Sequence, residues 1–341
     1  MRAAALTANG VIEIRDYPVP SIKDDEVLVK VSSAGICNSD IFRAFAMGAY
    51  GYPLVMGHEV SGEIVDAGPK VKSFSRGEKV VVFPLVPCRK CDSCRRKRWT
   101  HCRSYDYFGS RRDGGFQEYL AVGEWNLLPI PGGVDPSYAC LCEPVAVSVS
   151  AVGKVPAPRS GAKAAVIGAG LIGLSAAKLL QDKGYEPSVI DRNLFKLELA
   201  REMGLGTISV EEVLSSQDRF PLVLEATGAV NMFLQSIRLA QPSGVVVWVG
   251  NIQGNIEIDQ KEVSSILRKE LTIRGVWNSN YQQGRGDDWG EALRVIGENP
   301  WINRVVTHRI TLEELPSMLG DLYGLKTDPR HHEIIKVVVE L

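Results

Sequence analysis

The sequence has no excess of charge of either sign. Its 341 residues carry 39 Lys and Arg against 40 Asp and Glu, which gives a formal net charge of −1. A chain so close to neutral has no strong bulk attraction for nucleic acid or for a membrane surface. We therefore expect neither of these as a partner.

Long hydrophobic runs are lacking as well. No apolar run reaches the roughly 18 residues that a membrane-spanning helix needs. The first residues, 1–6, turn polar at once and lack the apolar core of a signal peptide. These absences favour a cytoplasmic location. Internal repeats and low-complexity tracts are also missing, so the sequence gives no sign of a repeat architecture.

The length favours two domains, because the chain is about twice the usual domain size. Up to about residue 145, short β-branched segments alternate with Gly and Pro turns, a pattern typical of an all-β, barrel-like domain. From about residue 160, apolar strands alternate with helical segments, which predicts a parallel, doubly wound sheet. The strands expected in the first part are Glu26–Val31, Glu63–Ala67, Glu78–Phe83 and Gln117–Val122.

The second part is expected to hold five strands and their connecting helices. A final β-branched strand, Ile334–Val339, has no helix after it and is expected to rejoin the first domain. The expected strands are Ala162–Ile167, Ser188–Ile190, Leu222–Glu225, Gly244–Val249 and Leu271–Val276, and the helices are Leu174–Asp182, Leu194–Met203, Val230–Leu239 and Asp288–Ile296.

A glycine motif, Gly168-Ala169-Gly170-Leu171-Ile172-Gly173, follows the strand that ends at Ile167 and opens a helix. This arrangement is typical of a dinucleotide site, where the backbone approaches the pyrophosphate at a helix N-terminus. Asp191 follows the next strand, 23 residues after the first glycine. Its carboxylate favours NAD by binding the ribose hydroxyls, whereas the neighbouring Arg192 could accommodate NADP.

Four of the seven cysteines, Cys88, Cys91, Cys94 and Cys102, lie within fifteen residues. In a reducing compartment this crowding favours a metal over disulfides. Four thiolates saturate a tetrahedral zinc, so the site is expected to be structural. Many basic residues surround it, and a nucleic-acid-binding zinc knuckle is the alternative reading. We prefer a solvated lobe whose cations offset the negative zinc–thiolate cluster.

A second group of possible metal ligands is dispersed along the chain. It comprises Cys37, His58, Glu59 and Glu143, with Asp40 as a carboxylate that could orient the histidine ring. A catalytic zinc needs about three protein ligands and one open position. Each residue alone is ambiguous. Their occurrence together with the cysteine cluster and the glycine motif predicts a catalytic zinc.

These motifs, in this order, resemble the zinc-dependent medium-chain dehydrogenase/reductase family along the whole chain. The resemblance extends to Gly77–Val81 and Asp113–Tyr119, and Glu143-Pro144 is similar to the polyol dehydrogenase branch. Two further segments, Tyr107–Tyr119 and Leu267–Trp277, are similar to a member of that branch that acts on a sugar-alcohol phosphate.

The resemblance implies a GroES-like β-rich catalytic domain (residues 1–147 and 298–341) interrupted by a Rossmann NAD-binding domain (residues 148–297). It assigns Cys37, His58 and Glu143 to the catalytic zinc, with Glu59 as a close or exchanging ligand, and the four clustered cysteines to the structural zinc. It also implies a homodimer or homotetramer.

Two positions depart from the family pattern. Phe42 stands where many relatives have the histidine that passes the alcohol proton to solvent, so the relay beyond Ser39 must differ, with Glu59 or Glu143 as substitutes. Asn278 stands nearest to an arginine of relatives that act on unphosphorylated polyols.

The expected function is zinc-dependent, NAD-linked oxidation of a secondary hydroxyl of a sugar-alcohol phosphate to the ketose phosphate, with Ser39 accepting the proton. Arg111 or Arg112 is expected to bind the phosphate, because guanidinium pairs well with phosphate oxygens. The alternatives are a dehydrogenase of unphosphorylated polyols, an NADPH-dependent quinone or enone reductase, and a non-catalytic regulator that binds NAD and zinc.

Overall fold

The computed structural model describes residues 1–215, 217–282, 287–325 and 332–341. Among these residues, no helix is both long and apolar enough to cross a membrane. The chain divides into two compact units, each of which is described by itself. Unit 1 holds residues 1–146, the described residues from 279 to 325, and residues 336–341; unit 2 holds the described residues from 147 to 278 and residues 332–335.

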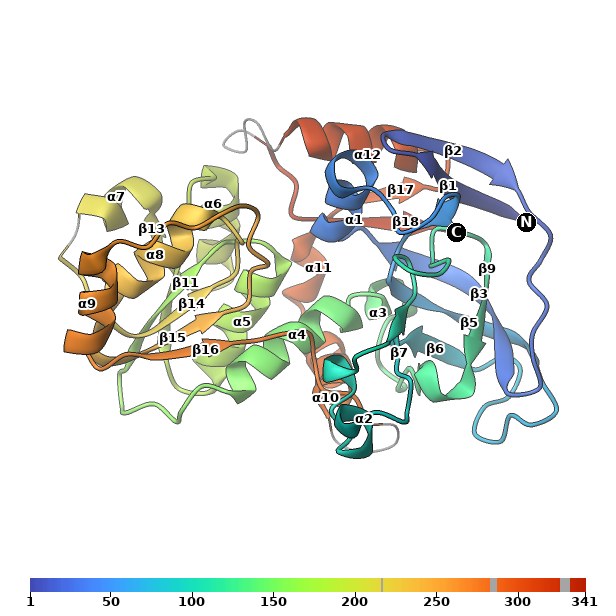
Figure 1. The fold of residues 1–341 in the computed structure, drawn as a ribbon, viewed down its shortest axis with the longest axis horizontal. Helices are drawn as coiled ribbons and strands as arrows, with labels where there is room; N and C mark the ends of the chain where they lie inside the picture. Colours follow the sequence, from blue (N-terminus) through green and yellow to red (C-terminus); the bar gives the residue numbers. More distant parts are fainter. Residues whose placement is uncertain (216, 283–286, 326–331) are drawn as a thin grey trace. The chain divides into compact units, whose positions relative to one another are not determined.

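Unit 2 is a six-stranded parallel sheet with the order β13-β12-β11-β14-β15-β16. The strand order reverses between β12 and β14, on either side of β11, and such a switch point is where doubly wound sheets bind their ligands. The α/β fold with a parallel nucleotide-type sheet is therefore confirmed (Figure 1). The strands are β11 (Lys163–Ile167), β12 (Glu186–Asp191), β13 (Gly206–Ser209), β14 (Phe220–Glu225), β15 (Ala240–Trp248) and β16 (Thr272–Gly275).

The central strands β11 and β14 are nearly continuous apolar runs because they are buried on both faces. In β11, the four residues after Lys163 are all buried. The strand β13 was not expected from the sequence, because it is four residues long and none of its residues is fully buried. The helices of unit 2 are α5 (Leu171–Asp182), α6 (Leu194–Glu202), α7 (Val210–Ser215), α8 (Val230–Leu239) and α9 (Gln260–Arg268).

Unit 1 is built on a seven-stranded sheet in which β3 (Glu26–Gly35) has three partners: β5 (Glu59–Ala67), β9 (Tyr119–Gly123) and β18 (Lys336–Glu340). The pairing of β18 with β3 is antiparallel and joins the last strand to one of the first (Figure 1). The other strands of this sheet are β6 (Lys79–Val82), β10 (Leu127–Pro129) and β17 (Val306–Thr311).

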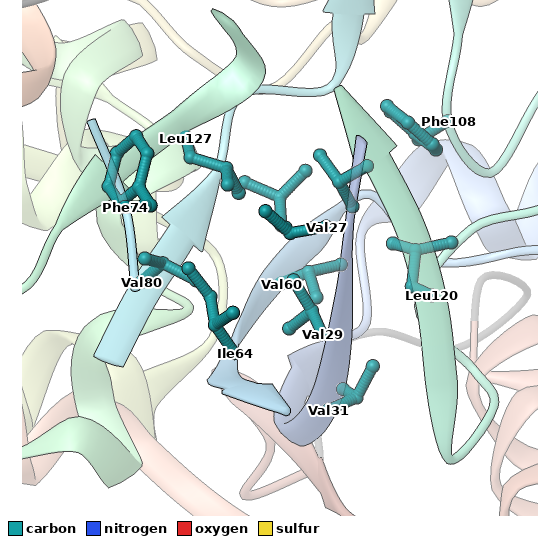
Figure 2. Close-up of a cluster of buried hydrophobic side chains, with 12 residues drawn as sticks. Val27, Val29, Val31, Val60, Ile64, Phe74, Val80, Phe108, Leu120 and Leu127 are labelled. Atoms are coloured by element: carbon teal, nitrogen blue, oxygen red, sulfur yellow. The ribbon is translucent and has the colours of Figure 1, made fainter. Parts of the chain in front are cut away.

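The core of unit 1 forms where alternate residues of these strands point to one face. Val27, Val29 and Val31 of β3 lie there with Val60 and Ile64 of β5, all at most 2% exposed (Figure 2). Their burial follows the period-2 pattern that predicted the strands from the sequence. The face also holds Phe74, Val80, Val82, Phe108, Leu120, Val122 and Leu127.

Unit 1 contains further small strands and several helices that the expected all-β pattern omitted. The short helices α1 and α3 have too few turns to show a 3.6-residue period in the sequence. The remaining elements are β1 (Arg2–Ala8), β2 (Val11–Asp16), β4 (Leu54–Val55), β7 (Leu85–Val86), β8 (Asp106–Tyr107), α1 (Asn38–Phe42), α2 (Asp92–Arg95), α3 (Pro136–Ala139), α10 (Asp288–Glu298), α11 (Ile302–Val305) and α12 (Leu315–Gly324). Helix α4 (Cys142–Gly153) runs through the division between the units.

The chain returns to unit 1 at Ser279, earlier than the residue 298 expected from the family resemblance. The physical reason is the packing of two aromatic residues. Trp289, in α10, and Tyr281 both contact Phe83, with ring centroids 5.3 and 4.2 Å away. Tyr281 also donates a hydrogen bond of 2.7 Å to the carbonyl of Trp125. These contacts hold α10 in the core of unit 1.

Candidate active site and metal centres

The first three candidate ligands lie at the ends of two paired strands. Cys37 follows the end of β3 and precedes α1, and Glu59 is the first residue of β5, directly after His58. In the β3–β5 register, Gly35 lies opposite Glu59. The ligand atoms of Cys37, His58 and Glu59 consequently lie within 4.8 Å of one another.

Asp40 lies behind the histidine. Its Oδ1 is 3.5 Å from His58 Nδ1, and its Oδ2 accepts a hydrogen bond of 2.9 Å from the backbone N–H of Cys37. Burial lowers the pKa of His58, but the charges of Asp40 and Cys37 more than offset this and hold the pKa well above its usual value. A metal ion would reverse the preference, because a ligating imidazole is neutral. Asp40 is thus positioned to fix the ring through Nδ1 and leave Nε2 for a metal.

Glu59 meets a buried lysine. Lys336 Nζ lies against Glu59 Oε2 and donates a hydrogen bond of 2.8 Å to the carbonyl of Ile36. The two residues are only 1% and 5% exposed. Among the described residues, the ammonium group of Lys336 is the ion-pair partner of Glu59 Oε2. A Cβ at Gly35 would fall on Glu59 Oε2 and Lys336 Cε, so a side chain there would displace the pair.

Glu143 lies in the first turn of α4 and is 7% exposed. Burial raises the pKa of Glu143 to about 7, with a further rise from Glu59 and opposing effects of His58 and Lys336. The Tyr107 hydroxyl is 3.4 Å from Glu143 Oε1, and the Tyr107 ring meets that of His58 edge-on at 5.8 Å. Glu143 stands outside the group of ligand atoms that lie within 4.8 Å of one another.

The donors of this site fit a catalytic zinc. One thiol, one imidazole and one carboxylate are the ligand types that zinc takes in open sites, where a fourth position serves a substrate oxygen. Glu59 Oε2 is buried and already has the ammonium group of Lys336 beside it, so its carboxylate is held ionised and able to act as a ligand. Ser39 is half-buried in the first turn of α1, and the half-buried Phe42 ends that helix without a group that can carry a proton.

The four clustered cysteines bring their sulfurs together within 4.8 Å. The Sγ of Cys94 is 3.5 Å from that of Cys91 and 3.9 Å from that of Cys88. Four sulfurs bound at about 2.3 Å to one zinc lie about 3.8 Å apart in a regular tetrahedron. Backbone N–H groups of Lys90 and Cys91 lower the pKa of Cys88 to about 6, which favours the thiolate that a metal needs. The cluster fits a closed, structural zinc.

The glycine motif forms the turn between β11 and α5, as its spacing predicts. Gly168 has φ +108°, and a Cβ at Gly173 would collide with the carbonyl of Gly168. A Cβ at Gly170 would meet no atom within 4 Å. The turn therefore has a tight first glycine, a closely packed third glycine and open space at the second, which fits a pyrophosphate at the N-terminus of α5. Leu171 and Ile172 form the first residues of that helix.

Asp191 ends β12 beside this turn. Its Oδ2 accepts a hydrogen bond of 2.7 Å from Ala169 N–H, and its Oδ1 accepts one of 2.9 Å from Asn193 N–H. Both oxygens keep further lone pairs for ribose hydroxyls. Arg192 is exposed. Burial lowers the pKa of Lys196, one turn into α6, although the charge of Asp191 opposes the change.

The loop with Arg111 and Arg112 lies against the segment that precedes His58. The backbone N–H groups of residues 114, 115 and 116 donate to the carbonyls of residues 55, 57 and 56 at 2.8, 2.8 and 3.0 Å. Arg112 lies over the Phe108 ring and is 3.5 Å from Asp106 Oδ2. Arg111 lies over the Tyr105 ring at 4.1 Å and donates a hydrogen bond of 2.7 Å to the carbonyl of Tyr105. The two arginines therefore have different surroundings.

Comparison with known proteins gives the family. A model described as the alcohol dehydrogenase GroES-like domain matches residues 23–132, and one described as the glucose dehydrogenase C-terminus matches residues 136–341. Galactitol 1-phosphate 5-dehydrogenase of Escherichia coli (strain K12) is 31% identical over 94% of this chain and 96% of its own. The crystal structure of galactitol-1-phosphate dehydrogenase from Escherichia coli superposes with a TM-score of 0.88 and 30% identity, over the whole of both chains.

Two other relatives are named for another substrate and for a bound cofactor, respectively. L-galactonate-5-dehydrogenase of Escherichia coli (strain K12) is 34% identical over 86% of each chain. A zinc-binding dehydrogenase from Sinorhizobium meliloti 1021, with NADP bound, has a TM-score of 0.88 and 27% identity over 100% of this chain and 99% of its own. The chain belongs to the zinc-dependent medium-chain dehydrogenase/reductase family. The relatives named above are dehydrogenases and hence oxidoreductases, and so is this protein. The resemblance that the sequence motifs indicated is confirmed.

Sequence reasoning missed two residues of the site. Lys336 carries a signal that could have been used, because it is a charged residue in the otherwise apolar run Ile334–Val339 and buried charges are rare without a partner. Tyr107 lies in a segment that resembles the family, but the sequence gives no reason to assign it a role in the site.

Proposed function

We propose that the protein oxidises a secondary hydroxyl of a sugar-alcohol phosphate to the ketose phosphate with NAD, as in the conversion of galactitol 1-phosphate to tagatose 6-phosphate. The observation that carries this proposal is the convergence of Cys37, His58 and Glu59, whose ligand atoms lie within 4.8 Å of one another, with Asp40 behind the histidine ring. Similarity to galactitol 1-phosphate 5-dehydrogenase over 94% of the chain supports the substrate.

Cys37, His58 and either Glu59 or Glu143 would hold the catalytic zinc, and the four clustered cysteines would hold the structural one. When bound, zinc would supply Lewis-acid chemistry that lowers the pKa of the substrate hydroxyl, and NAD would supply the hydride acceptor. Ser39 takes the proton of the hydroxyl. Phe42 cannot pass this proton on. The proton therefore reaches solvent through the carboxylate of Glu59 or Glu143.

We infer a preference for NAD over NADP from Asp191. Its carboxylate lies beside the glycine turn and would repel a 2′-phosphate on the adenosine ribose, while its oxygens can accept from the ribose hydroxyls. Because the Sinorhizobium relative has NADP bound, kcat/KM is to be compared with NAD and with NADP.

A second candidate is oxidation of a polyol or sugar acid without a phosphate. Similarity to L-galactonate-5-dehydrogenase, at 34% identity, favours it. A non-catalytic regulator is the alternative of another class, and it would bind NAD without turnover.

The experiment that separates these candidates follows absorbance at the NADH band with a panel of substrates. The panel contains galactitol 1-phosphate, other polyol phosphates, the free polyols and L-galactonate, each with NAD and with NADP. The proposal expects the highest kcat/KM with a polyol phosphate and NAD. Equal kcat/KM for galactitol and galactitol 1-phosphate would refute the phosphate, and NAD binding without turnover of any substrate would favour the regulator.

A further inference from the structure

Two arginines converge on one exposed aromatic ring in unit 1. The guanidinium carbons of Arg43 and Arg111 lie 5.6 and 5.1 Å from the ring centroid of Tyr50. The ring is 73% exposed. Arg111 also lies over Tyr105, so its guanidinium contacts two aromatic rings.

Neither arginine of this pair has a carboxylate partner among the residues that the structure describes. In the described part of this loop, the ion pair is formed by Arg112 instead, with Asp106. Two like charges on one ring repel each other, and a ring attracts each cation only weakly at an exposed site. The place is therefore a local excess of positive charge that favours an anion.

Both arginines are linked by contacts to residues of the candidate catalytic metal site. Arg43 is the first residue after α1, the helix that begins directly after Cys37, and its backbone N–H donates to the carbonyls of Ser39 and Asp40. On the other side, the rings of Tyr105 and Tyr107 meet at 6.2 Å. Tyr107 in turn contacts the ring of His58 and the carboxylate of Glu143.

The geometry of Arg111 suits the binding of an anion. Its Nη1 is fixed by the carbonyl of Tyr105 at 2.7 Å, and the ring of Tyr105 lies under the guanidinium plane. These contacts leave the other donors of the guanidinium for a ligand while reducing the entropy lost on binding. A phosphate monoester carries up to two negative charges and several oxygens, so it can pair with two guanidinium groups at once.

We propose that Arg43 and Arg111, at the Tyr50 ring, bind the terminal phosphate of the substrate. The inference rests on the proposed function, deepens it by adding Arg43, and favours Arg111 over the paired Arg112. The site uses two chain segments: the one that follows the zinc-ligand cysteine and the loop beside His58. It thus holds the charged end of the substrate at a distance from the reacting hydroxyl.

The test compares Arg43→Gln, Arg111→Gln and Arg112→Gln, with Arg76→Gln as a control for loss of one exposed charge elsewhere in unit 1. KM for galactitol 1-phosphate is expected to rise at least about tenfold in each of the first two variants, because a hydrogen bond to a charged group is lost. The rise in Arg112→Gln is expected to be much smaller, and Arg76→Gln is expected to match the unmodified enzyme.

A second measurement does not depend on turnover. Binding of inorganic phosphate to the NAD-saturated enzyme is followed by calorimetry, with NAD filling the pyrophosphate turn. Arg43→Gln and Arg111→Gln are each expected to weaken phosphate binding several-fold, and the double variant less than the product of the two. Unchanged phosphate binding in both single variants overturns the site.

The outcomes separate this inference from the proposed function. If the unmodified enzyme prefers galactitol 1-phosphate but KM stays unchanged in both variants, the arginine site is wrong and the substrate assignment stands. If the enzyme does not discriminate between galactitol and its phosphate, the substrate assignment is wrong and the calorimetry alone decides the site. A lower KM for L-galactonate than for galactitol 1-phosphate would overturn the phosphate as the bound group.

Discussion

Lys336 and Glu59 form a buried pair at the edge of the candidate catalytic site: the lysine Nζ lies against the carboxylate that would complete or approach the zinc sphere. The same ammonium group donates to the carbonyl of Ile36, next to Cys37. The lysine is therefore a fixed cation that would compete with a metal for one carboxylate.

Replacing this lysine is expected to affect the metal-free protein more than the metal-loaded one. In Lys336→Met, the buried carboxylate of Glu59 loses its cation, which costs about 3 kcal/mol of unfolding free energy. Zinc can supply the missing charge, so the loss is expected to shrink when the metal is bound. The measurement is the thermal midpoint of the variant and the unmodified protein, with zinc and after chelation.

Lys79→Met, at the exposed first position of β6, serves as the matched control for this change. It is expected to give the same small shift in both metal states. A shift in Lys336→Met that is equal with and without zinc would contradict the competition for Glu59.

The two metal sites are expected to differ in what they support. Cys37→Ser and His58→Ala are expected to abolish turnover in a folded protein, because they remove ligands of the open site. Cys88→Ser and Cys94→Ser are expected to lower the thermal midpoint, because a structural zinc contributes directly to folding. Metal analysis is expected to find two zinc ions per chain; one or none in active protein refutes the assignment.

The cofactor preference is expected to depend on Asp191. Asp191→Ala removes the charge that repels a 2′-phosphate and leaves Arg192 free to meet it. The ratio of kcat/KM with NAD to that with NADP is expected to fall at least about tenfold. This is the effect expected when one hydrogen bond to a charged group is lost. Asp191→Asn is the companion variant, because its side-chain oxygen can still accept from one backbone N–H. An unmodified enzyme that already prefers NADP contradicts the role of Asp191.

The change of the unfolding free energy with pH is expected to depend in part on Glu225, which is fully buried at the end of β14. Burial raises the pKa of Glu225, although hydrogen bonds from Thr227 and Gly228 oppose the rise. The folded state thus keeps a proton that the unfolded chain has released, so this contribution is full at low pH and is lost as pH rises through the folded pKa.

Glu225→Gln is expected to flatten the decline of unfolding free energy with rising pH, measured by denaturant titrations across the acidic and neutral range. Glu212→Gln is a control of opposite sign, because the backbone N–H of Ser209 lowers the pKa of the exposed Glu212. An unchanged pH profile in Glu225→Gln would show that this carboxyl keeps an ordinary pKa.

The features that the sequence predicted well are local. The glycine motif and the four cysteines each lie within one short segment, so spacing alone fixes what they can form. Most strands of both sheets followed from apolar periodicity, but β10, β13 and β17 were not expected. Strand β13 escaped because its four residues, Gly206–Ser209, are neither continuously buried nor alternating.

The features that escaped prediction are contacts between distant segments. The contact of Lys336 with Ile36 joins residues 300 positions apart, and neither residue type predicts the presence of the other. Arg43 and Tyr50 are seven residues apart, whereas Arg111, which contacts the same ring, comes from a distant segment. Periodicity and spacing carry no information on such pairs, because register between strands and loop packing decide them.

The pairing of β18 with β3 sets an order in which the protein can assemble. All six strands of the unit 2 sheet come from the continuous stretch between Lys163 and Gly275, so that sheet can form while later residues are still being synthesised. The unit 1 sheet cannot be complete before β18, which lies some 300 residues after β3. Until Lys336 emerges from the ribosome, Glu59 has no ammonium beside it, and zinc supplied early would find that carboxylate without its competitor.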